Sequence, residues 1–476
     1  MFFRHLVKDS AIYGGADFLA KLTAFLTFPL IAAALSPQAF GAFELIVITT
    51  ALLGMIANCG LNNSLQRFYW DEETPQPKRP ALVSTGFAAL LGLSLAALLL
   101  SAVVVAFVYG WLKDWILPAT AIGLGAALVL MVANQLNQYL LDVIRLHMAP
   151  WRFLVISVFA RVLTAFAGLG AVVVLGWGID GLLLAQLCVA LLTIPFAITL
   201  VRKDVTLQLS RDAGVKLIEF GYPFIYAGVA FWLFSSMDRW MLAAMTSVEE
   251  VGIYSVAGRF SLLVMFLSTA FGLAWSPWAM KIRLEQPDGY RAVYAGVLIA
   301  LASAILVVGG GLALFSRELM SFLPDGYAGA AMPLAVLSLG LVMQTTQQVT
   351  AVGISLEKKT YLFARLSWAA AVINFFMNLL LIPVMGVLGA ALATAAAYFF
   401  LTSGYLYFTQ KLHPLPISWP RLSIWLALLT FVATAVFLLQ MQQLSLNLIL
   451  LKCMVLLICV VVGGLLVSWK SYGHIR

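Results

Sequence analysis

The stretch that decides the fold runs from Glu219 to Phe260 and reads EFGYPFIYAGVAFWLFSSMDRWMLAAMTSVEEVGIYSVAGRF. Its uninterrupted apolar run, Tyr222 to Leu233, is too long for a buried strand and is typical of a membrane-spanning helix. Asp238 and Arg239 follow in the same helix, and Arg259 lies about two turns into the next one. A charge at membrane depth is costly and therefore faces a partner or a wet cavity. The stretch predicts two adjacent spanning helices that carry an acid and two arginines into the bilayer.

A weaker copy of this stretch lies upstream. Setting Gly41 under Gly252 (252 − 41 = 211) aligns a serine and an aromatic residue in each copy: Ser36 with Ser247, and Phe43 with Tyr254. A second match places Gly178–Gly181 under Gly386–Gly389 with nearly the same offset (389 − 181 = 208). Chance similarity among small residues is the alternative for either match alone. Together they predict a duplicated unit of roughly 210 residues.

The composition excludes a soluble protein. Hydrophobic residues make up 63% of the 476 residues and charged residues 10%, and the mean hydropathy is +1.01. A soluble domain carries about a quarter charged residues. The four cysteines, Cys59, Cys188, Cys453 and Cys459, lie within apolar runs and are interpreted as packing residues, so neither a metal nor another cofactor is expected. The net charge of +8 follows membrane topology, and no nucleic-acid partner is expected.

The apolar runs predict an all-α polytopic membrane protein with about fourteen transmembrane helices. The runs lie at roughly 8–34, 39–65, 80–109, 115–143, 151–175, 179–201, 215–244, 250–279, 290–315, 328–355, 360–383, 386–410, 421–440 and 445–469. The repeat divides them into an N-terminal six-helix lobe, a cytoplasmic linker, a C-terminal six-helix lobe, and an additional helix pair with a cytoplasmic tail: 1–201, 202–214, 215–410 and 411–476.

The distribution of Lys and Arg predicts the orientation. One set of alternating connections holds nearly all the basic residues, whereas the other holds only Lys113 and Arg317. The positive-inside rule therefore places both termini in the cytoplasm. The two lobes then share one orientation and are related by an axis along the membrane normal.

Charged side chains inside the predicted helices are the first candidates for function. The cations are Lys21, Arg161, Arg239, Arg259 and Lys452, and the acids at depth are Asp17, Glu44 and Asp238. Because cations outnumber acids, a wet cavity with this lining would attract a polyanion such as a pyrophosphate. We interpret Lys21, Arg161, Arg239 and Arg259 as substrate-binding, and the three acids as candidates for ion coupling.

Several of these charges also have structural interpretations: Asp17 and Lys21 as a pair four residues apart, Asp238 with Arg239 as a tie between helices, and Glu44 as a cap or pair near the periplasmic boundary. Lys452 lies about two turns inside its helix and is expected to snorkel to the interface. Arg161 and Arg259 have no evident partner nearby in the sequence, which favours them as ligand groups.

Amide side chains form a second set of candidates. Asn374 and Asn378 are four residues apart on one face of the eleventh predicted helix, and Gln344 lies in the tenth. The fourth predicted helix, the counterpart of the tenth, holds Asn134, Gln135, Asn137 and Gln138. These amides either join helices by hydrogen bonds or bind sugar hydroxyls, and the sequence leaves both open. We include Gln344, Asn374 and Asn378 in the predicted substrate-binding set.

The sequence shows no sign of catalysis. It holds no HExxH, GxSxG or P-loop pattern and no connection long enough for a catalytic loop. A transporter is therefore predicted, and a membrane glycosyltransferase or polymerase is disfavoured.

Three segments resemble polysaccharide exporters of the multidrug/oligosaccharidyl-lipid/polysaccharide (MATE-like) superfamily. The first combines Pro37–Phe43 (PQAFGAF), Asn58–Leu61 (NCGL) and Arg67–Tyr69 (RFY). The second is Asp238-Arg239 with Val251–Arg259 (VGIYSVAGR), and the third is Asn374, Asn378, Ile382-Pro383 and Gly386–Ala391 (GVLGAA). The resemblance covers essentially the whole chain and specifies the family better than the substrate.

The resemblance implies a flippase that moves an undecaprenyl-pyrophosphate-linked oligosaccharide across the bacterial cytoplasmic membrane by alternating access. Its implied partners are this glycan, membrane lipid and polysaccharide polymerase machinery. Lys21 and Arg259 match arginines of the related lipid II flippase, but Thr27 stands where that protein has a second first-helix arginine. This departure favours an O-antigen or exopolysaccharide repeat unit. The lipid II flippase and a MATE-type drug/cation antiporter are the alternatives, although the extra helix pair and the excess of cations disfavour the antiporter.

Overall fold

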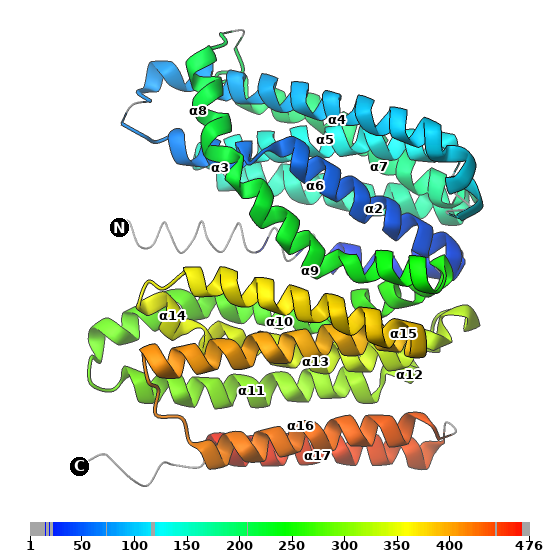
Figure 1. Ribbon diagram of the computed structural model, residues 1–476, viewed down its shortest axis with the longest axis vertical. Coiled ribbons are helices and arrows are strands. Elements are labelled where there is room, and N and C mark those ends of the chain that lie inside the picture. The colour runs from blue at the N-terminus through cyan, green and yellow to red at the C-terminus, as the bar shows by residue number, and fades with distance from the viewer. Residues whose placement is uncertain are drawn as a thin grey trace. The chain divides into compact units, whose positions relative to one another are not determined.

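The computed structural model of the protein describes residues 15, 19, 22–72, 74–115, 120–206, 208–442 and 445–468, with only the backbone of 111–115 and Ser276. These residues form helices joined by short connections, without a strand (Figure 1). An apolar helix over Leu22–Ala34 comes first. It is followed by α2 (Pro37–Asn58), α3 (Leu61–Phe68), η1 (Gln76–Lys78), α4 (Arg79–Trp115), α5 (Ala121–Leu146), α6 (Pro150–Leu169), η2 (Gly170–Val174), α7 (Gly178–Val201), α8 (Arg211–Gly221), α9 (Pro223–Met245), α10 (Val248–Glu285), α11 (Tyr290–Leu314), α12 (Ser316–Met320), η3 (Asp325–Ala330), α13 (Ala331–Thr350), α14 (Val352–Leu356), α15 (Tyr361–Leu412), α16 (Trp419–Gln440) and α17 (Leu446–Ser468).

The predicted class of all-α polytopic membrane protein is confirmed. Within the described chain, twelve helical segments are long and apolar enough to cross a membrane. The longest of them, α15, has 52 residues and contains one non-helical position, Gly386, where two predicted spans meet. Each part of α15 exceeds the roughly 20 residues that a span requires.

The chain forms two compact units that meet within α9, the first ending at Ser236 and the second beginning at Met237. In the first unit, α5 packs against α2, α4 and α7, while α8 packs against α3 and α4. In the second unit, α13 packs against α10, α11 and α15. The two C-terminal helices, α16 and α17, pack on each other and on α11 (Figure 1).

The two serines that align between the copies are both helix N-caps. Ser36 Oγ accepts a hydrogen bond from the backbone N–H of Ala39 (3.2 Å), and Ser247 Oγ accepts one from Glu250 (3.2 Å). A free N–H at the start of a helix needs such an acceptor. Each serine therefore fixes where a helix begins, α2 in one copy and α10 in the other.

The aligned glycines are also equivalent in conformation. Gly178 and Gly386 have positive φ values of 57° and 53°. Side-chain-bearing residues rarely adopt this conformation. At Gly386 a Cβ would also lie 2.7 Å from a carboxylate oxygen of Glu250. The glycines thus allow the bends that precede α7 and the second part of α15.

The single helix expected over 39–65 is interrupted, which corrects that prediction. Cys59 and Gly60 adopt positive φ values of 49° and 68° between α2 and α3. A Cβ on Gly60 would lie 2.2 Å from the carbonyl oxygen of Gly221, so only glycine permits this close approach to α8. The break turns the following residues into a separate short helix.

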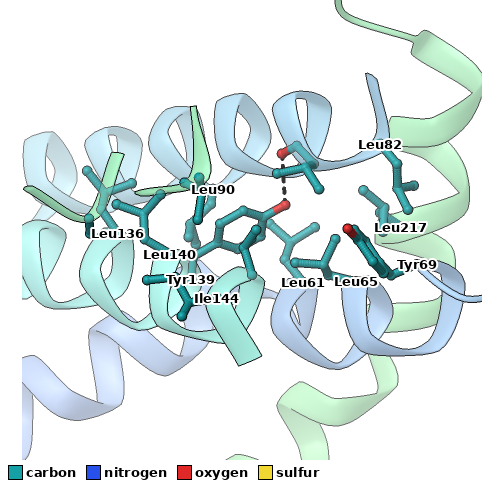
Figure 2. Close-up of a cluster of buried hydrophobic side chains, with 14 of the residues drawn as sticks. Leu61, Leu65, Tyr69, Leu82, Leu90, Leu136, Tyr139, Leu140, Ile144 and Leu217 are labelled. Atoms are coloured by element: carbon teal, nitrogen blue, oxygen red, sulfur yellow. Dashed lines mark hydrogen bonds between the residues drawn. The ribbon is translucent and has the colours of Figure 1, made fainter. Parts of the chain in front are cut away.

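The core of the first unit joins α3, α4, α5 and α8 (Figure 2). Leu61 and Leu65 from α3, and Leu217 from α8, are fully buried beside Tyr139 of α5. The Tyr139 hydroxyl donates to the carbonyl oxygen of Val83 on α4 (2.9 Å). Helices in lipid associate through close packing and interhelical hydrogen bonds of this kind.

The C-terminal pair is fixed to the second unit by two basic residues. Lys452 on α17 is fully buried, with Nζ 2.6 and 2.9 Å from the carboxylate oxygens of Glu318 on α12. The expectation that Lys452 snorkels to the interface is therefore wrong, because the carboxylate of Glu318, itself 22% exposed, stabilises the charge of the buried lysine in place. Arg317 Nη1 donates to the carbonyl oxygens of Gln440 (3.2 Å) and Gln442 (2.5 Å) at the end of α16.

Candidate functional site

The centre of the candidate site is Asp238, a buried carboxylate on α9. Its Oδ2 accepts a hydrogen bond of 2.5 Å from the hydroxyl of Tyr254 on α10. The cap at Ser247 begins α10 directly after α9, so Asp238 and Tyr254 lie about two turns from the same corner on adjacent helices. Charge-assisted bonds of this kind are shorter and stronger than neutral ones.

Arg239 partly neutralises this carboxylate. Its Nη1 lies 3.5 Å from Asp238 Oδ1, and its guanidinium lies 5.6 Å from the ring centre of Tyr254. The arginine side chain is 19% exposed, so the pair is only weakly screened by solvent. The two charges were interpreted as a tie between helices; they contact each other within α9, and the bond from Tyr254 to Asp238 joins α9 to α10.

Two predicted amides extend the cluster into α15. Asn378 Nδ2 donates to Asn374 Oδ1 (3.0 Å), and Asn374 Nδ2 donates to Thr394 Oγ1 (3.4 Å). The hydroxyls of Thr394 and Tyr254 are 3.3 Å apart. The bend at Gly386 lets the two parts of α15 face each other, which brings the asparagines next to the threonine. We define the Asp238 cluster as Asp238, Arg239, Tyr254, Asn374, Asn378 and Thr394.

Sequence reasoning missed Tyr254 and Thr394 as members of this cluster. Tyr254 had appeared as an aromatic residue aligned with Phe43 and within the segment Val251–Arg259, but in neither case for the hydroxyl that bonds Asp238. Thr394 gave no signal, because an isolated threonine in a small-residue helix commonly bonds its own backbone.

The cluster is rich in oxygen atoms and holds one carboxylate. Among the described residues, no three His, Cys, Asp or Glu side chains are placed to hold a metal ion together. Asn378 Oδ1 is buried without a hydrogen-bond partner. A carboxylate with amide and hydroxyl oxygens can bind a proton or a small hard cation.

The other predicted residues are not among the members of the Asp238 cluster. Arg161 is exposed on α6, and Arg259 is half-buried on α10, where it does not lack a partner. Glu44 is buried on α2 and also has a partner. Gln344 on α13 has a buried Oε1 without a hydrogen-bond partner. Asp17 and Lys21 lie outside the described residues.

The amides of the fourth and tenth predicted helices divide between the two interpretations. Asn137 on α5 donates to the Ala190 carbonyl oxygen of α7 (2.8 Å), and Gln347 on α13 donates to Thr402 of α15 (3.0 Å). These two amides join helices. Gln135 instead lines a cavity in the first unit.

Residues 6–283 match the family model described as "Polysaccharide biosynthesis protein". Two curated relatives come from Haloferax volcanii. The "Probable flippase AglR" is 30% identical over 171 residues, which are 34% of this chain and 35% of the relative. The "Probable low-salt glycan biosynthesis flippase Agl15" is 22% identical over 181 residues, 37% of each chain. The matches thus span about a third of each relative's length.

Solved structures share the fold over most of their lengths. The "Lipid II flippase MurJ, inward closed conformation" has a TM-score of 0.69 at 14% identity, covering 96% of this chain and 98% of that one. A "multidrug resistance MATE family transporter of the MOP superfamily" in its inward-facing conformation has a TM-score of 0.62 at 14% identity, covering 84% and 94%. The fold is that of membrane transporters rather than enzymes. The chain therefore belongs to the polysaccharide biosynthesis protein family, with the fold of the multidrug/oligosaccharidyl-lipid/polysaccharide exporters.

Proposed function

We propose that the protein is a flippase that moves an undecaprenyl-pyrophosphate-linked oligosaccharide, an O-antigen or exopolysaccharide repeat unit, across the cytoplasmic membrane. The observation that carries this proposal is the family match over residues 6–283, in a chain whose described residues form spanning helices. The two curated relatives bear the names of probable flippases, which supports the same assignment.

In the proposed mechanism, the lobes 1–201 and 215–410 rock between a cytoplasm-open and a periplasm-open state. Lys21, Arg161 and Arg259 neutralise the pyrophosphate, because charge-assisted hydrogen bonds from Lys and Arg to phosphate oxygens are strong. The polyprenyl tail stays in lipid, and Gln344 contributes a sugar contact through its partnerless oxygen. Both termini lie in the cytoplasm, in accord with the distribution of basic residues.

The Asp238 cluster is the proposed coupling element, with Asp17 and Glu44 as further candidates. Binding of a proton or a small cation at Asp238 would weaken its bonds to Tyr254 and Arg239, because both depend on the negative charge. Asn374 and Asn378 were predicted to bind substrate. Since both are buried and bonded within the cluster, their proposed role is to hold its geometry.

Depletion of the protein from growing cells tests the function. We expect lipid-linked oligosaccharide to accumulate on the cytoplasmic leaflet, where it stays protected from a glycan-cleaving enzyme added outside. Wild type should relieve the accumulation, whereas Arg259→Ala and Lys21→Ala, at equal membrane abundance, should not.

The matched control is Lys281→Ala. Lys281 lies on the same helix as Arg259, and its half-exposed side chain pairs with Glu285 at 3.6 Å and lies 5.2 Å from the ring centre of Trp278. This variant should rescue like wild type, apart from the small loss expected for a surface pair. An unchanged lipid-linked pool on depletion, together with altered tolerance of cationic drugs, would support the antiporter instead.

A further inference from the structure

The first unit holds an open cavity of about 490 Å³ between α2, α3, α5 and α9. Its volume lies within the roughly 300–1,000 Å³ typical of small-molecule sites. One side is lined by amides, Asn58, Asn62, Asn63 and Gln135. The other side presents the rings of Phe224 and Phe231 from α9, which are 41% and 72% exposed.

The amide side is held in one arrangement by a buried acid outside the cavity. Asp142 on α5 is 3% exposed, and its Oδ2 accepts a hydrogen bond from Asn62 Nδ2 (2.8 Å). Gln138 Nε2 (3.3 Å) and Arg145 Nη1 (3.5 Å) contact its Oδ1. A carboxylate only accepts, so Asn62 must turn its NH₂ towards Asp142 and its oxygen towards the cavity side.

The orientation of the Asn62 amide in turn determines the orientations of the Asn58 and Gln135 amides. Asn62 Oδ1 accepts from Asn58 Nδ2 (2.9 Å), and Gln135 Oε1 accepts from the same nitrogen (3.0 Å). Both N–H bonds of Asn58 are therefore in use. Asn58 Oδ1 is left as an acceptor and Gln135 Nε2 as a donor, each without a partner among the described side chains. Asn63, exposed on α3, adds an unused amide.

The chemistry of this lining selects a saccharide. None of the described residues that line the cavity is charged, so it offers nothing to balance a pyrophosphate. A polyprenyl chain would leave the fixed amides without hydrogen bonds, at a cost of about 1–3 kcal/mol for each group. A sugar ring instead offers hydroxyls that both donate and accept on its edge, and an apolar C–H face that can pack on aromatic rings.

We infer that this cavity is the glycan subsite of the proposed flippase, with Asn58, Asn63 and Gln135 bonding sugar hydroxyls and Phe224 and Phe231 packing against a ring. The inference rests on the proposed function and divides the substrate into two parts. The neutral amides bind the sugar, and the cations of the proposed mechanism bind the pyrophosphate.

The test measures how much labelled lipid-linked saccharide binds to the full-length protein in lipid nanodiscs. The labelled probe is the ¹⁴C-glucose-labelled lipid-linked saccharide pool, extracted with butanol from the cells that make the protein. Two competitors are added separately: the glycan released from this pool by mild acid, and undecaprenyl phosphate. Asn63→Ala and Phe231→Ala are compared with Gln66→Ala and Tyr226→Ala, which change an exposed amide on α3 and an exposed aromatic residue on α9 outside the cavity lining.

We expect the released glycan to compete about tenfold less well in each cavity variant, the effect of losing about one hydrogen bond or ring contact. Competition by undecaprenyl phosphate should not change, and both control variants should match wild type. Glycan competition equal to wild type in the cavity variants, or an equal loss for both competitors, would overturn the glycan subsite while the flippase stands. If wild type retains none of the labelled pool, the proposed function fails and the subsite fails with it.

Discussion

The same interhelical bond occurs once in each unit with different residues. In the first unit, Thr193 of α7 donates to Asn137 of α5 (3.1 Å), and in the second, Gln347 of α13 donates to Thr402 of α15 (3.0 Å). The positions are 210 and 209 residues apart (347 − 137 = 210; 402 − 193 = 209). A bond between equivalent helices is therefore kept, although the direction of donation is reversed.

The ends of these helices repeat a second contact with its chemistry exchanged. His147 Nε2 pairs with Asp204 in the first unit, whereas His413 Nδ1 lies 3.0 Å from Glu357 Oε1 in the second. The acid of one unit aligns with the histidine of the other (357 − 147 = 210; 413 − 204 = 209). The two units therefore have an acid–histidine contact at the same aligned positions. The acid and the histidine have exchanged places between the units.

The bond between Asp238 and Tyr254 in the second unit has no counterpart at the aligned positions of the first. Asp238 aligns with Thr27 and Tyr254 with Phe43 (238 − 27 = 211; 254 − 43 = 211). The Thr27 hydroxyl donates to Thr23 O of its own helix (3.0 Å), so it needs no partner on another helix. Only the second unit therefore has a buried acid at this place.

The reverse holds for the cavity network of the first unit. Gln135 aligns with Thr345 and Asp142 with Val352 (345 − 135 = 210; 352 − 142 = 210). The Thr345 hydroxyl bonds the Leu341 carbonyl oxygen within its own helix (2.8 Å). The comparison indicates that the two units differ in their polar interiors, with an amide-lined cavity in the first and the Asp238 cluster in the second.

The largest effect is expected where the units differ most. Asp238→Ala removes the acceptor of the Tyr254 hydroxyl and the carboxylate that pairs with Arg239, and removing one partner of a buried ion pair costs about 3–5 kcal/mol. We expect transport of the lipid-linked saccharide to fall by about a hundredfold or more. The counterpart variant Thr27→Ala should transport at close to the wild-type rate. A wild-type transport rate in Asp238→Ala would show that transport does not require the Asp238 carboxylate.

The sequence predicts the frame of this molecule better than its interior. Ser36, Ser247, Gly178 and Gly386 are readable because a helix cap or a positive φ restricts the residue type strongly. Asp238 is readable because a charge in an apolar run is rare. Its partner Tyr254 is not, since a tyrosine in a membrane helix is ordinary and only the structure shows that its hydroxyl on α10 bonds Asp238 on α9.

Lys452 is a second case in which the sequence shows a charged residue but not its partner. Its charge was visible in the sequence, but its partner Glu318 is 134 residues away on a short helix outside the predicted spans. The cavity amides Asn58 and Asn62 gave no separate signal, because their roles depend on the break after α2 that turns α3 against α5.

A second prediction concerns the helix pair that only the second unit carries. Equivalent helices begin at Arg79 and Tyr290 (290 − 79 = 211). Of the residues in an apolar 18-residue stretch of each spanning segment, 6% are buried in the first unit and 67% in the second, where α16 and α17 pack on the helix. Glu318→Gln leaves Lys452 buried without a counter-charge, and we expect a loss of about 3–5 kcal/mol in unfolding free energy, measured by SDS titration in mixed micelles. The double variant Glu318→Gln/Lys452→Met should recover most of that loss. A single variant as stable as wild type would mean that the pair is held by packing alone.

A smaller effect on transport is expected when Tyr254 is replaced by phenylalanine, the residue type at the aligned position Phe43 of the first unit. Tyr254→Phe removes the hydroxyl that bonds Asp238 but keeps the ring, which should cost about 1.5–3 kcal/mol for a hydrogen bond to a charged group. Transport should fall by about tenfold to a hundredfold, less than for Asp238→Ala. The reciprocal control Phe43→Tyr should not raise transport, because no acid lies at the aligned position. Equal transport by Tyr254→Phe and wild type would assign the short bond a structural role only.

The smallest effect should come from exchanging the histidine and the acid. His147→Asp combined with Asp204→His gives the first unit the arrangement of the second. Each single change removes a partly exposed pair, with His147 23% and Asp204 12% exposed, so we expect a loss of only about 1 kcal/mol in unfolding free energy in the same SDS titration. The double variant should approach wild-type stability, because the aligned pair in the second unit shows that this frame accepts either order. A double variant less stable than both single variants would mean that the surroundings of each pair, such as the bond between the Tyr290 hydroxyl and His413 (2.9 Å), fix the order in each unit.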